Sequence, residues 1–446
     1  MTLMPLMRLK SLFVLAAAAL VLNACGGGGG GGSSSPAPAP SAAVTPTPAA
    51  CSAIATVATN AQTLCVGGGP TGEFTNVVMT SVTVCQPGTT NCVVIPNVQV
   101  DTGSSGLRLL RSELGGLATT LPAVTDAANA NVPYGECGSF ADGIVWGTLA
   151  SADVKLAGET ASNIPIQIIL DNVTTPAVPA DCSDQGTAED SQTALGANGI
   201  IGVGLFLQDC GAACVSNSTF TLNNQLIAQY YDCPTNGTCT PAAIPLASQV
   251  PNPVSAFTQD NNGVILQIPA IPDTGVASAA ATIFFGIGTE SNNVLKGTLI
   301  NATVTNDAAG VFTANYAGTS YADSFLDSGS SAYFVNTSSI PDCASGSPAS
   351  AYLCPGATSS ISLQQPSITV TSSNGASLAT TVKIANANFL FAQANASSLF
   401  DFDDLGAPAG TTLPNAFDFG VPFFFGKTVF TGFQNGTYPY GYFSWE

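Results

Sequence analysis

The sequence contains no histidine among its 446 residues. Without an imidazole there is no Ser-His-Asp triad, no Cys-His pair and no histidine-ligated zinc or haem. Acid–base chemistry in this chain therefore falls mainly to carboxylates, with tyrosine and the scarce lysines as weaker substitutes. The absence of one residue type thus narrows the possible reactions sharply.

Charge is scarce as well. Charged residues make up 8% of the chain, against about 25% in an ordinary domain. Only 8 residues are Lys or Arg while 27 are Asp or Glu, and the resulting net charge of −19 repels a phosphate backbone. We therefore expect no nucleic-acid partner.

The hydrophobic fraction of 46% is typical of a globular protein, and the length allows one large domain or two to three ordinary ones.

The apolar run at the N-terminus is too short to span a bilayer. Residues 12–22 follow two basic residues, but a transmembrane helix needs about 20 apolar residues. The run ends in Leu-Asn-Ala-Cys at 22–25, which resembles the signal of bacterial lipoproteins. We therefore predict a signal peptide at residues 1–24, a lipidated Cys25 and a location in the cell envelope, at the outer membrane, facing the periplasm or the cell surface. The alternative is an ordinary signal peptide with Cys25 merely nearby.

Residues 25–60 are predicted to form a tether. Seven glycines at 26–32 precede a segment rich in Pro, Ala, Ser and Thr at 33–50. This segment has no charge and no apolar periodicity, so we expect it to be extended at about 3.1 Å per residue.

The chain contains 13 cysteines. If Cys25 carries lipid, an even number remains, and in an exported protein this favours disulfides over metal binding. The alternative, a cytosolic cysteine-rich metal site, lacks the paired Cys-x-x-Cys units that such sites use. The predicted pairs are Cys85–Cys92, Cys210–Cys214, Cys233–Cys239 and Cys343–Cys354, completed by Cys51–Cys65 and Cys137–Cys182.

Short runs rich in Val, Ile, Thr and Phe alternate with Gly, Pro, Asn and Ser from about residue 65 onward. This pattern indicates a mainly β fold with too many strands for one simple sandwich. Helical periodicity is scarce, and the best candidate for a helix is Leu222–Tyr231. The clearest predicted strands are Asn76–Val84, Cys92–Val100, Gly143–Leu149, Asn163–Leu170, Val264–Ile268, Thr282–Ile287 and Ser367–Thr371.

An internal repeat organises this strand-rich part. Asp-Thr-Gly-Ser at 101–104 follows an apolar run, and Asp-Ser-Gly-Ser at 327–330 does so again. Each copy is followed at similar distance by an apolar element that ends in glycine, at 199–202 and at 417–420. Two halves on one plan indicate a duplicated lobe.

Paired aspartates suit catalysis without histidine. Two carboxylates facing each other in a cleft do not both ionise readily, so they share one proton and their pKa values separate. Asp101 and Asp327 would then hold a water, one as general base and the other as the acid that protonates a scissile carbonyl. Gly103 and Gly329 permit the tight loops that carry them. The competing interpretation is that both aspartates merely stabilise turns.

These motifs resemble the pepsin-like, two-lobed aspartic proteases, over residues 74–446. The resemblance implies two pseudo-symmetric β lobes, predicted at 61–290 and 291–446, with a cleft between them. Further segments similar to that family are 134–139 with 142–144 (its flap hairpin), 198–204, 282–290 and 419–425.

The resemblance also implies roles around the aspartate pair. The hydroxyls of one threonine and one serine would bond across the two loops, and two further serines would hold the outer carboxylate oxygens. Tyr134 is the corresponding flap tyrosine; a solvated turn tyrosine is the alternative. The supporting residues so assigned are Thr102, Gly103, Ser104, Ser328, Gly329 and Ser330.

Several positions depart from the family or are assigned no role. Arg108 stands where the family usually has a tryptophan, and we expect it either to pair with an acidic group such as Glu136 or to bind a substrate carboxylate. A third Asp-Thr-Gly, at 273–275, follows a proline and lacks the serine, so we predict a plain turn there. Trp146 and the phenylalanines at 423–425 are predicted to be core or strand residues.

The leading hypothesis is a membrane-tethered aspartic endopeptidase that acts on polypeptides, as a monomer and without metal or cofactor. A second hypothesis is a non-catalytic protein of the same fold that binds a polypeptide or polysaccharide in its cleft. A third is a structural surface lipoprotein.

Overall fold

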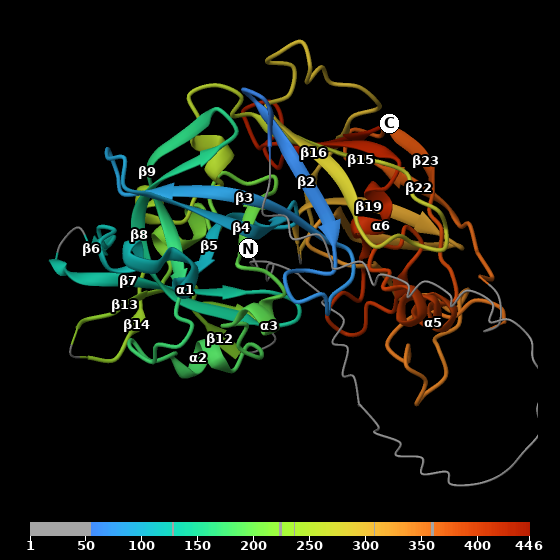
Figure 1. Cartoon of the computed structure of the whole chain (residues 1–446), viewed down its shortest axis with the longest axis horizontal. Helices are drawn as coiled ribbons and strands as arrows, with labels where there is room; N and C mark the ends of the chain where they lie inside the picture. The colour runs from blue at the N-terminus through green and yellow to red at the C-terminus, as the bar shows by residue number, and fades with distance from the viewer. Residues whose placement is uncertain (1–54, 127–128, 223–224, 236, 307, 358–360) are drawn as a thin grey trace, which may run out of the picture.

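The structure is a computed structural model that describes residues 55–126, 129–222, 225–235, 237–306, 308–357 and 361–446. Strands dominate its regular structure, and the helices are few and short. Figure 1 shows one group of strands from the first half of the chain (blue to green) and one from the second half (orange to red), with β2, β15 and β16 between them. The expected mainly β, two-lobed fold is confirmed.

Six strands of the first lobe close into a ring. β3 pairs with β4, β4 with β10, β10 with β5, β5 with β9, β9 with β8, and β8 again with β3. Val, Ile and Leu side chains from these strands are buried together in one core, as the alternation of a pleated strand directs. The ring strands are β3 Val77–Cys85, β4 Cys92–Asp101, β5 Ser105–Leu110, β8 Ile144–Leu156, β9 Glu159–Ile169 and β10 Gly199–Val203.

A further layer lies along the edge of this ring. β7 (Asn129–Ser139) pairs with β8 on one side and with β13 (Tyr230–Asp232) on the other. The helix predicted at Leu222–Tyr231 is wrong, because β12 (Gln225–Ile227) and β13 occupy that segment. Backbone pairing with β7 replaces helical hydrogen bonds, and Leu226 is 60% exposed, so no apolar helix face is buried there.

One continuous antiparallel sheet joins both ends of the chain. Its order is β2, β16, β15, β26, β27, β17, and β2 also pairs with β3 of the ring. Because β2 and β26 come from opposite ends of the sequence, this sheet ties the two lobes together. The predicted lobe boundary at residue 290 stays a prediction. The strands are β2 Ala61–Gly67, β15 Gly263–Ile268, β16 Ala279–Phe285, β17 Ile300–Asn301, β26 Lys427–Gly432 and β27 Tyr442–Trp445.

The second lobe is built from short strands and one longer helix. α5 (Ala387–Ser397) begins after Asn386, whose side chain accepts from the Phe389 N–H, and it buries Leu390 and Phe391 in a second core. The sequence did not predict this helix, which carries no charge to mark its ends. The strands are β19 Ala309–Tyr316, β20 Thr319–Leu326, β21 Tyr333–Val335, β22 Ser367–Thr371, β23 Ser377–Thr381, β24 Gly406–Ala407 and β25 Phe417–Phe419.

The repeated motif occupies the same local structure in both halves. In the first half, β4 ends at Asp101 and runs parallel to β10, which pairs antiparallel with β5. In the second half, β20 leads into Asp327 and runs parallel to β25, which pairs antiparallel with β21. The duplication inferred from the sequence is therefore a duplication of structure.

The other sequence predictions on described residues mostly agree with the structure. The seven predicted strands correspond to β3, β4, β8, β9, β15, β16 and β22, with ends shifted by several residues in some cases. Trp146 is buried, and Phe423–Phe425 lie in the core around the short helix α6 (Val421–Phe424). Residues 273–275 form a turn, in which the Gly275 N–H donates to Pro272 O (2.8 Å).

Five of the six predicted disulfides are present: Cys85–Cys92, Cys137–Cys182, Cys210–Cys214, Cys233–Cys239 and Cys343–Cys354. The partner predicted for Cys65, Cys51, lies outside the described residues, as do the signal peptide, Cys25 and most of the tether. At the end of the predicted tether, Thr56–Ala58 forms β1 and pairs with β2. No helix in the part of the chain that the structure describes is long and apolar enough to cross a membrane.

Candidate active site

Hydrogen bonds between backbone groups and two side-chain hydroxyls hold the two aspartate loops face to face. The Thr102 N–H donates to Ser328 Oγ (3.1 Å), and the Ser328 N–H donates to Thr102 Oγ1 (2.9 Å). Each hydroxyl donates in turn to a carbonyl of the opposite strand, Thr102 to Leu326 O (3.3 Å) and Ser328 to Val100 O (2.8 Å). These four buried hydrogen bonds are reciprocal and join the two lobes. This is the arrangement that the resemblance to pepsin-like aspartic proteases implied.

Asp101 is held by its own loop. The Gly103 N–H donates to Asp101 Oδ1 (2.8 Å), and the Ser104 hydroxyl donates to Asp101 Oδ2 (2.5 Å). A Cβ on Gly103 would lie 2.6 Å from Cγ of Asp327, which is closer than real Cβ contacts. Glycine is therefore required here because the opposite carboxyl group packs directly against it.

Asp327 is held in the same way. The Gly329 N–H donates to Asp327 Oδ1 (2.6 Å), and the Ser330 hydroxyl lies 2.9 Å from Asp327 Oδ2. A Cβ on Gly329 would lie 2.6 Å from Asp101 Oδ1. All eight residues that the sequence assigned to the aspartate pair and its support therefore lie together.

Both carboxyl groups are shielded from solvent. Asp101 and Asp327 are 0% exposed. Burial raises the pKa of Asp327 well above its usual value. The nearby carboxyl groups of Asp101 and Asp418, and then a hydrogen bond with Asp101, raise it further. Two carboxyl groups in such contact hold a proton between them, because their joint ionisation is unfavourable.

A third carboxyl group, which the sequence analysis assigned no role, adjoins the pair. Asp418 on β25 is 1% exposed, and its Oδ2 lies 2.6 Å from the Ser330 hydroxyl. Burial raises the pKa of Asp418 well above its usual value. The hydrogen bond with Ser330 opposes this effect in part, and the charge of Asp101 adds to it. The signal in the sequence was an acid in the second apolar element, at the position where the first element has Ile200.

Arg108 forms a second buried polar cluster. The Arg108 guanidinium is 0% exposed and donates to Glu136 Oε1, to Asp209 Oδ2 (2.8 Å) and to Ser105 O (2.8 Å). The expected pairing with Glu136 is confirmed, and burial makes it more than a surface salt bridge. Burial alone would lower the pKa of Arg108, but Glu136 and Asp209 outweigh it and raise the pKa.

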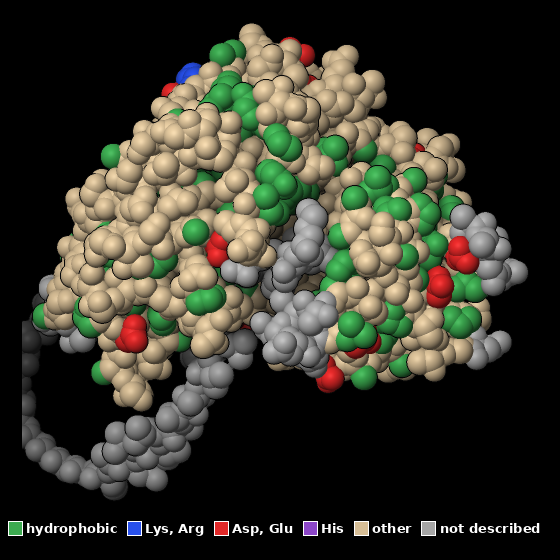
Figure 2. All heavy atoms as spheres, turned by 180° about the vertical axis from the view of Figure 1, so that it is seen from behind, with side chains coloured by type: hydrophobic (Ala, Val, Ile, Leu, Met, Phe, Trp, Pro, Cys, Tyr) green, Lys and Arg blue, Asp and Glu red, His purple; other side chains and the backbone are tan. Residues whose placement is uncertain are grey.

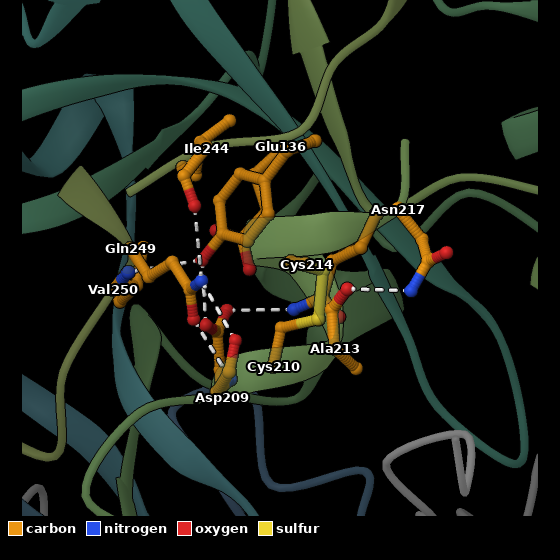
Figure 3. Close-up of a disulfide and its surroundings, with 12 residues drawn as sticks. Glu136, Asp209, Cys210, Ala213, Cys214, Asn217, Ile244, Gln249 and Val250 are labelled. Atoms are coloured by element: carbon orange, nitrogen blue, oxygen red, sulfur yellow. Dashed lines mark hydrogen bonds between the residues drawn. A yellow bond between two sulfur atoms is a disulfide. The ribbon is translucent and has the colours of Figure 1, made fainter. Parts of the chain in front are cut away.

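Asp209 connects this cluster to a disulfide-closed loop. Burial, and then Glu136, raises the pKa of Asp209, and Tyr230 donates its hydroxyl to Asp209 Oδ1 (2.5 Å). Figure 3 shows Asp209 next to the Cys210–Cys214 disulfide. Gln249 binds the same loop through the Gly211 N–H (2.7 Å) and the Gly211 carbonyl (2.9 Å). Arg108 thus links β7 to this loop through Glu136 and Asp209.

Tyr134 lies on β7 within an apolar cluster. It is 3% exposed and packs with Leu149 and Tyr230, so the alternative of a solvated turn tyrosine does not hold. Its hydroxyl lies 3.5 Å from Asp126 Oδ1. Burial raises the pKa of Tyr134 to about 12, and the charge of Asp126 is the second cause. Tyr134 is not among the residues that line the cavity beside the aspartate loops.

A cavity of about 380 Å³ adjoins the aspartate loops. Thr102, Gly103 and Ser104 form part of its wall, and most of the remaining lining is apolar. The apolar lining includes Leu205, Phe206, Val311, Phe325, Leu326 and Tyr440. Charged side chains are also sparse on the face of the molecule in Figure 2.

One group of carboxylates among the described residues has the spacing of a cation site. Ligand oxygens of Asp273, Asp403 and Asp404 lie within 4.8 Å of one another. Lys383 already donates to Asp273 (2.6 Å) and to Asp403 (2.6 Å), so an ammonium group balances this cluster. The third Asp-Thr-Gly therefore supplies an ion-pair partner rather than a member of the aspartate pair.

Comparison with solved structures finds the aspartic proteinase from Irpex lacteus, at 15% identity and a TM-score of 0.47; the match covers 86% of this chain and 97% of that chain. No curated protein matches the chain. The family model described as "protein of unknown function (DUF3443)" matches residues 56–442. Because this match extends over most of the sequence, the chain belongs to the DUF3443 family.

Proposed function

We propose that the chain is an aspartic-type endopeptidase with a pepsin-like fold. The observation that carries this proposal is the pair Asp101 and Asp327, each held by a glycine N–H and a serine hydroxyl and joined through the crossed bonds of Thr102 and Ser328. A structural role in turns would not require two loops from distant parts of the chain to meet with both carboxyl groups buried.

The chemistry follows from one shared proton. The ionised carboxylate of the pair takes a proton from a bound water, and the water oxygen attacks the peptide carbonyl carbon. The protonated carboxyl gives its proton to the carbonyl oxygen, which yields a tetrahedral diol. As the C–N bond of this diol breaks, the protonated carboxyl gives its proton to the leaving nitrogen. The ionised carboxylate takes a proton from a diol hydroxyl, which yields the carboxylic acid product and leaves one proton on the pair again. No covalent enzyme intermediate forms, and no histidine is needed.

The substrate proposed is an extended polypeptide. The cavity beside Thr102, Gly103 and Ser104 has space for several side chains, and its lining is mostly apolar, with Asp209 as its one acid. A peptide in the cleft would add as a strand and bond through its backbone to the cleft edges. We propose that the chain acts as a monomer.

We further propose that the protein is exported and held at the bacterial outer membrane by lipid on Cys25. A lipidated cysteine with several acyl chains anchors firmly, whereas a single chain does not. A Cys25→Ala variant is expected in the soluble envelope fraction, while the unchanged protein is expected with the membranes. A variant that stays with the membranes would count against lipidation.

One observation favours a second candidate, a non-catalytic protein that binds a polypeptide or polysaccharide. Both carboxyl groups are fully buried, whereas hydrolysis requires water and a carbonyl to reach them. An Asp327→Asn variant separates the candidates, because it abolishes hydrolysis but leaves binding largely intact.

The test uses the full chain, exported so that its disulfides form. A mixed peptide library is digested from pH 3 to pH 7, with and without a statine-type transition-state analogue. Cleavage is expected, sensitive to the analogue and absent in Asp101→Asn and Asp327→Asn, while Asp273→Asn in the third Asp-Thr-Gly serves as the matched control. A folded protein that cuts nothing across this range would overturn the proposal.

A further inference from the structure

Ser330 has one hydroxyl hydrogen and two carboxyl groups within hydrogen-bond distance. Its Oγ lies 2.9 Å from Asp327 Oδ2 and 2.6 Å from Asp418 Oδ2. A single hydrogen serves one acceptor only, so one of the two carboxyl groups must itself donate to Ser330 or lose the bond. In the other half of the molecule, Ser104 serves Asp101, and an isoleucine stands at the position equivalent to Asp418.

The surroundings of Asp418 disfavour its ionised form. On β25 it lies opposite Phe325 of β20 and Phe334 of β21. It forms no ion pair among the residues described, and its Oδ1 has no hydrogen-bond partner there. An uncompensated buried carboxylate is costly, so the protonated form is favoured over a wide pH range.

The titratable groups that face Asp418 are few. Asp327 follows β20, and Asp101 ends β4 across the lobe interface; both are acids. Tyr333 on β21 is titratable as well, but its electrostatic neighbours are Asp403 and Asp404. No lysine or arginine contributes to the electrostatics of Asp418. Loss of its proton therefore adds a second negative charge beside the single one that the aspartate pair carries.

We propose that Asp418 is a positioning residue that controls the aspartate pair through Ser330. In its protonated form Asp418 donates to Ser330 Oγ, so the hydrogen of Ser330 points to Asp327 Oδ2. This inference rests on the proposed function, since it concerns the proton that Asp101 and Asp327 share.

The protonation state of Asp418 controls hydrolysis because it determines which oxygen of the pair carries the shared proton. While Ser104 donates to Asp101 Oδ2 and Ser330 donates to Asp327 Oδ2, both outer oxygens are occupied as acceptors, so the shared proton stays on the inner oxygens of the pair. When Asp418 ionises, it takes the hydrogen of Ser330, because the shorter contact then becomes a charge-assisted bond. Asp327 Oδ2 is left without a donor and takes up the proton on the outer side, where it does not reach a substrate. Ionisation of Asp418 thus stops hydrolysis as the pH increases, and it sets the alkaline limb of the pH profile.

The test compares pH profiles of kcat/KM for a cleaved peptide, each normalised to its own maximum. Asp418→Asn and Asp418→Leu cannot ionise, so the alkaline limb is expected to move to higher pH, by about one pH unit. Leu suits the phenylalanine neighbours and provides a second variant if the amide fails to fold. Asp401→Asn, at another fully buried acid, is the matched control and is expected to leave the limb in place.

The path through Ser330 is tested by a double-mutant cycle. In a Ser330→Ala background, Asp418→Asn is expected to leave the alkaline limb where Ser330→Ala alone puts it, because the connecting hydroxyl is gone. A limb that stays in place or moves to lower pH in Asp418→Asn would overturn the inference. An equal shift with and without Ser330 would overturn it too.

A readout without turnover separates this inference from the proposed function. Infrared difference spectra of the unchanged protein against Asp418→Asn are expected to contain a protonated carboxyl band that titrates, and whose titration shifts in Ser330→Ala. If this band is found while no peptide is cleaved, the endopeptidase proposal fails and the protonated Asp418 stands. If peptides are cleaved and the band is missing, Asp418 is ionised and the inference fails.

Discussion

At the scale of single residues, each aspartate of the pair packs against a glycine of the opposite loop. The space that a Cβ would need on Gly103 is filled by the Asp327 carboxyl group, and the space on Gly329 by that of Asp101. The two small residues therefore set the closeness of the carboxyl groups, and the crossed hydroxyl bonds of Thr102 and Ser328 maintain it.

A Gly103→Ala substitution is expected to push the two loops apart. Overpacking of this kind costs about 1–3 kcal/mol of unfolding free energy, and loss of the paired geometry is expected to lower kcat/KM by about a hundredfold. Gly116→Ala, where a Cβ would meet nothing within 4 Å, is the control. Urea unfolding and peptide kinetics measure both effects; equal behaviour of the two variants would contradict the packing argument.

The residues of the pair were predictable, while Asp418 was not. Asp101 and Asp327 stand in a motif that occurs twice with the same apolar approach, and chemistry without histidine requires paired acids. Asp418 stands in a strand whose pattern is apolar, and its contact with Ser330 depends on the parallel pairing of β20 and β25. A contact of this kind between residues 88 positions apart is set by tertiary structure.

At the scale of elements, strands with strong alternation or β-branched runs were predictable, but short mixed segments were not. Residues 222–231 contain apolar residues at helical spacing, yet β7 offers an open edge that pairs with β13. The helix α5 depends on the second core for its stability, so its uncharged sequence gave little indication of it.

The cluster around Arg108 shows how β7 and the loop at Asp209 are fixed together. Arg108→Met leaves Glu136 and Asp209 buried without their cation, which typically costs about 3–5 kcal/mol. Burial already raises the folded-state pKa of Asp209 above its unfolded value, and loss of the cation raises it further. A buried acid with a raised pKa lowers the unfolding free energy of the protein as the pH increases above the unfolded pKa of about 4.

The destabilisation by Arg108→Met is therefore expected to be larger at pH 7 than at pH 4, measured by urea unfolding. Adding Glu136→Gln to Arg108→Met removes one of the unpaired charges and is expected to recover part of the loss at pH 7. A loss that is the same at both pH values would contradict the charge argument and leave only lost packing.

At the scale of the whole molecule, the fold buries many more acids than cations. Acids with raised pKa lie in both lobes, and burial is the first cause for each. For example, burial raises the pKa of Asp404 to about 8, and the charge of Asp403 is the second cause of this increase. The five acids with the largest increases in pKa are Asp209, Asp327, Asp401, Asp404 and Asp418.

The chain is therefore expected to be more stable at pH 5 than at pH 8. In this range the folded protein holds protons on these acids that the unfolded chain has released, so stability falls as pH rises. Thermal unfolding at several pH values measures this, and Asp404→Asn is expected to flatten the dependence. A melting temperature that increases from pH 5 to pH 8 would contradict the account of the buried acids.

The most direct measurement of the central claim is the pH dependence of kcat/KM for one cleaved peptide. The account predicts a bell-shaped profile, because activity needs one proton on two carboxyl groups, and a loss of about 10²–10⁴-fold in both Asp101→Asn and Asp327→Asn. Asp273→Asn is expected to retain the profile. A kcat/KM that is unchanged in either variant of the pair, or a profile without an acid limb, would contradict the claim that Asp101 and Asp327 act together as the catalytic pair.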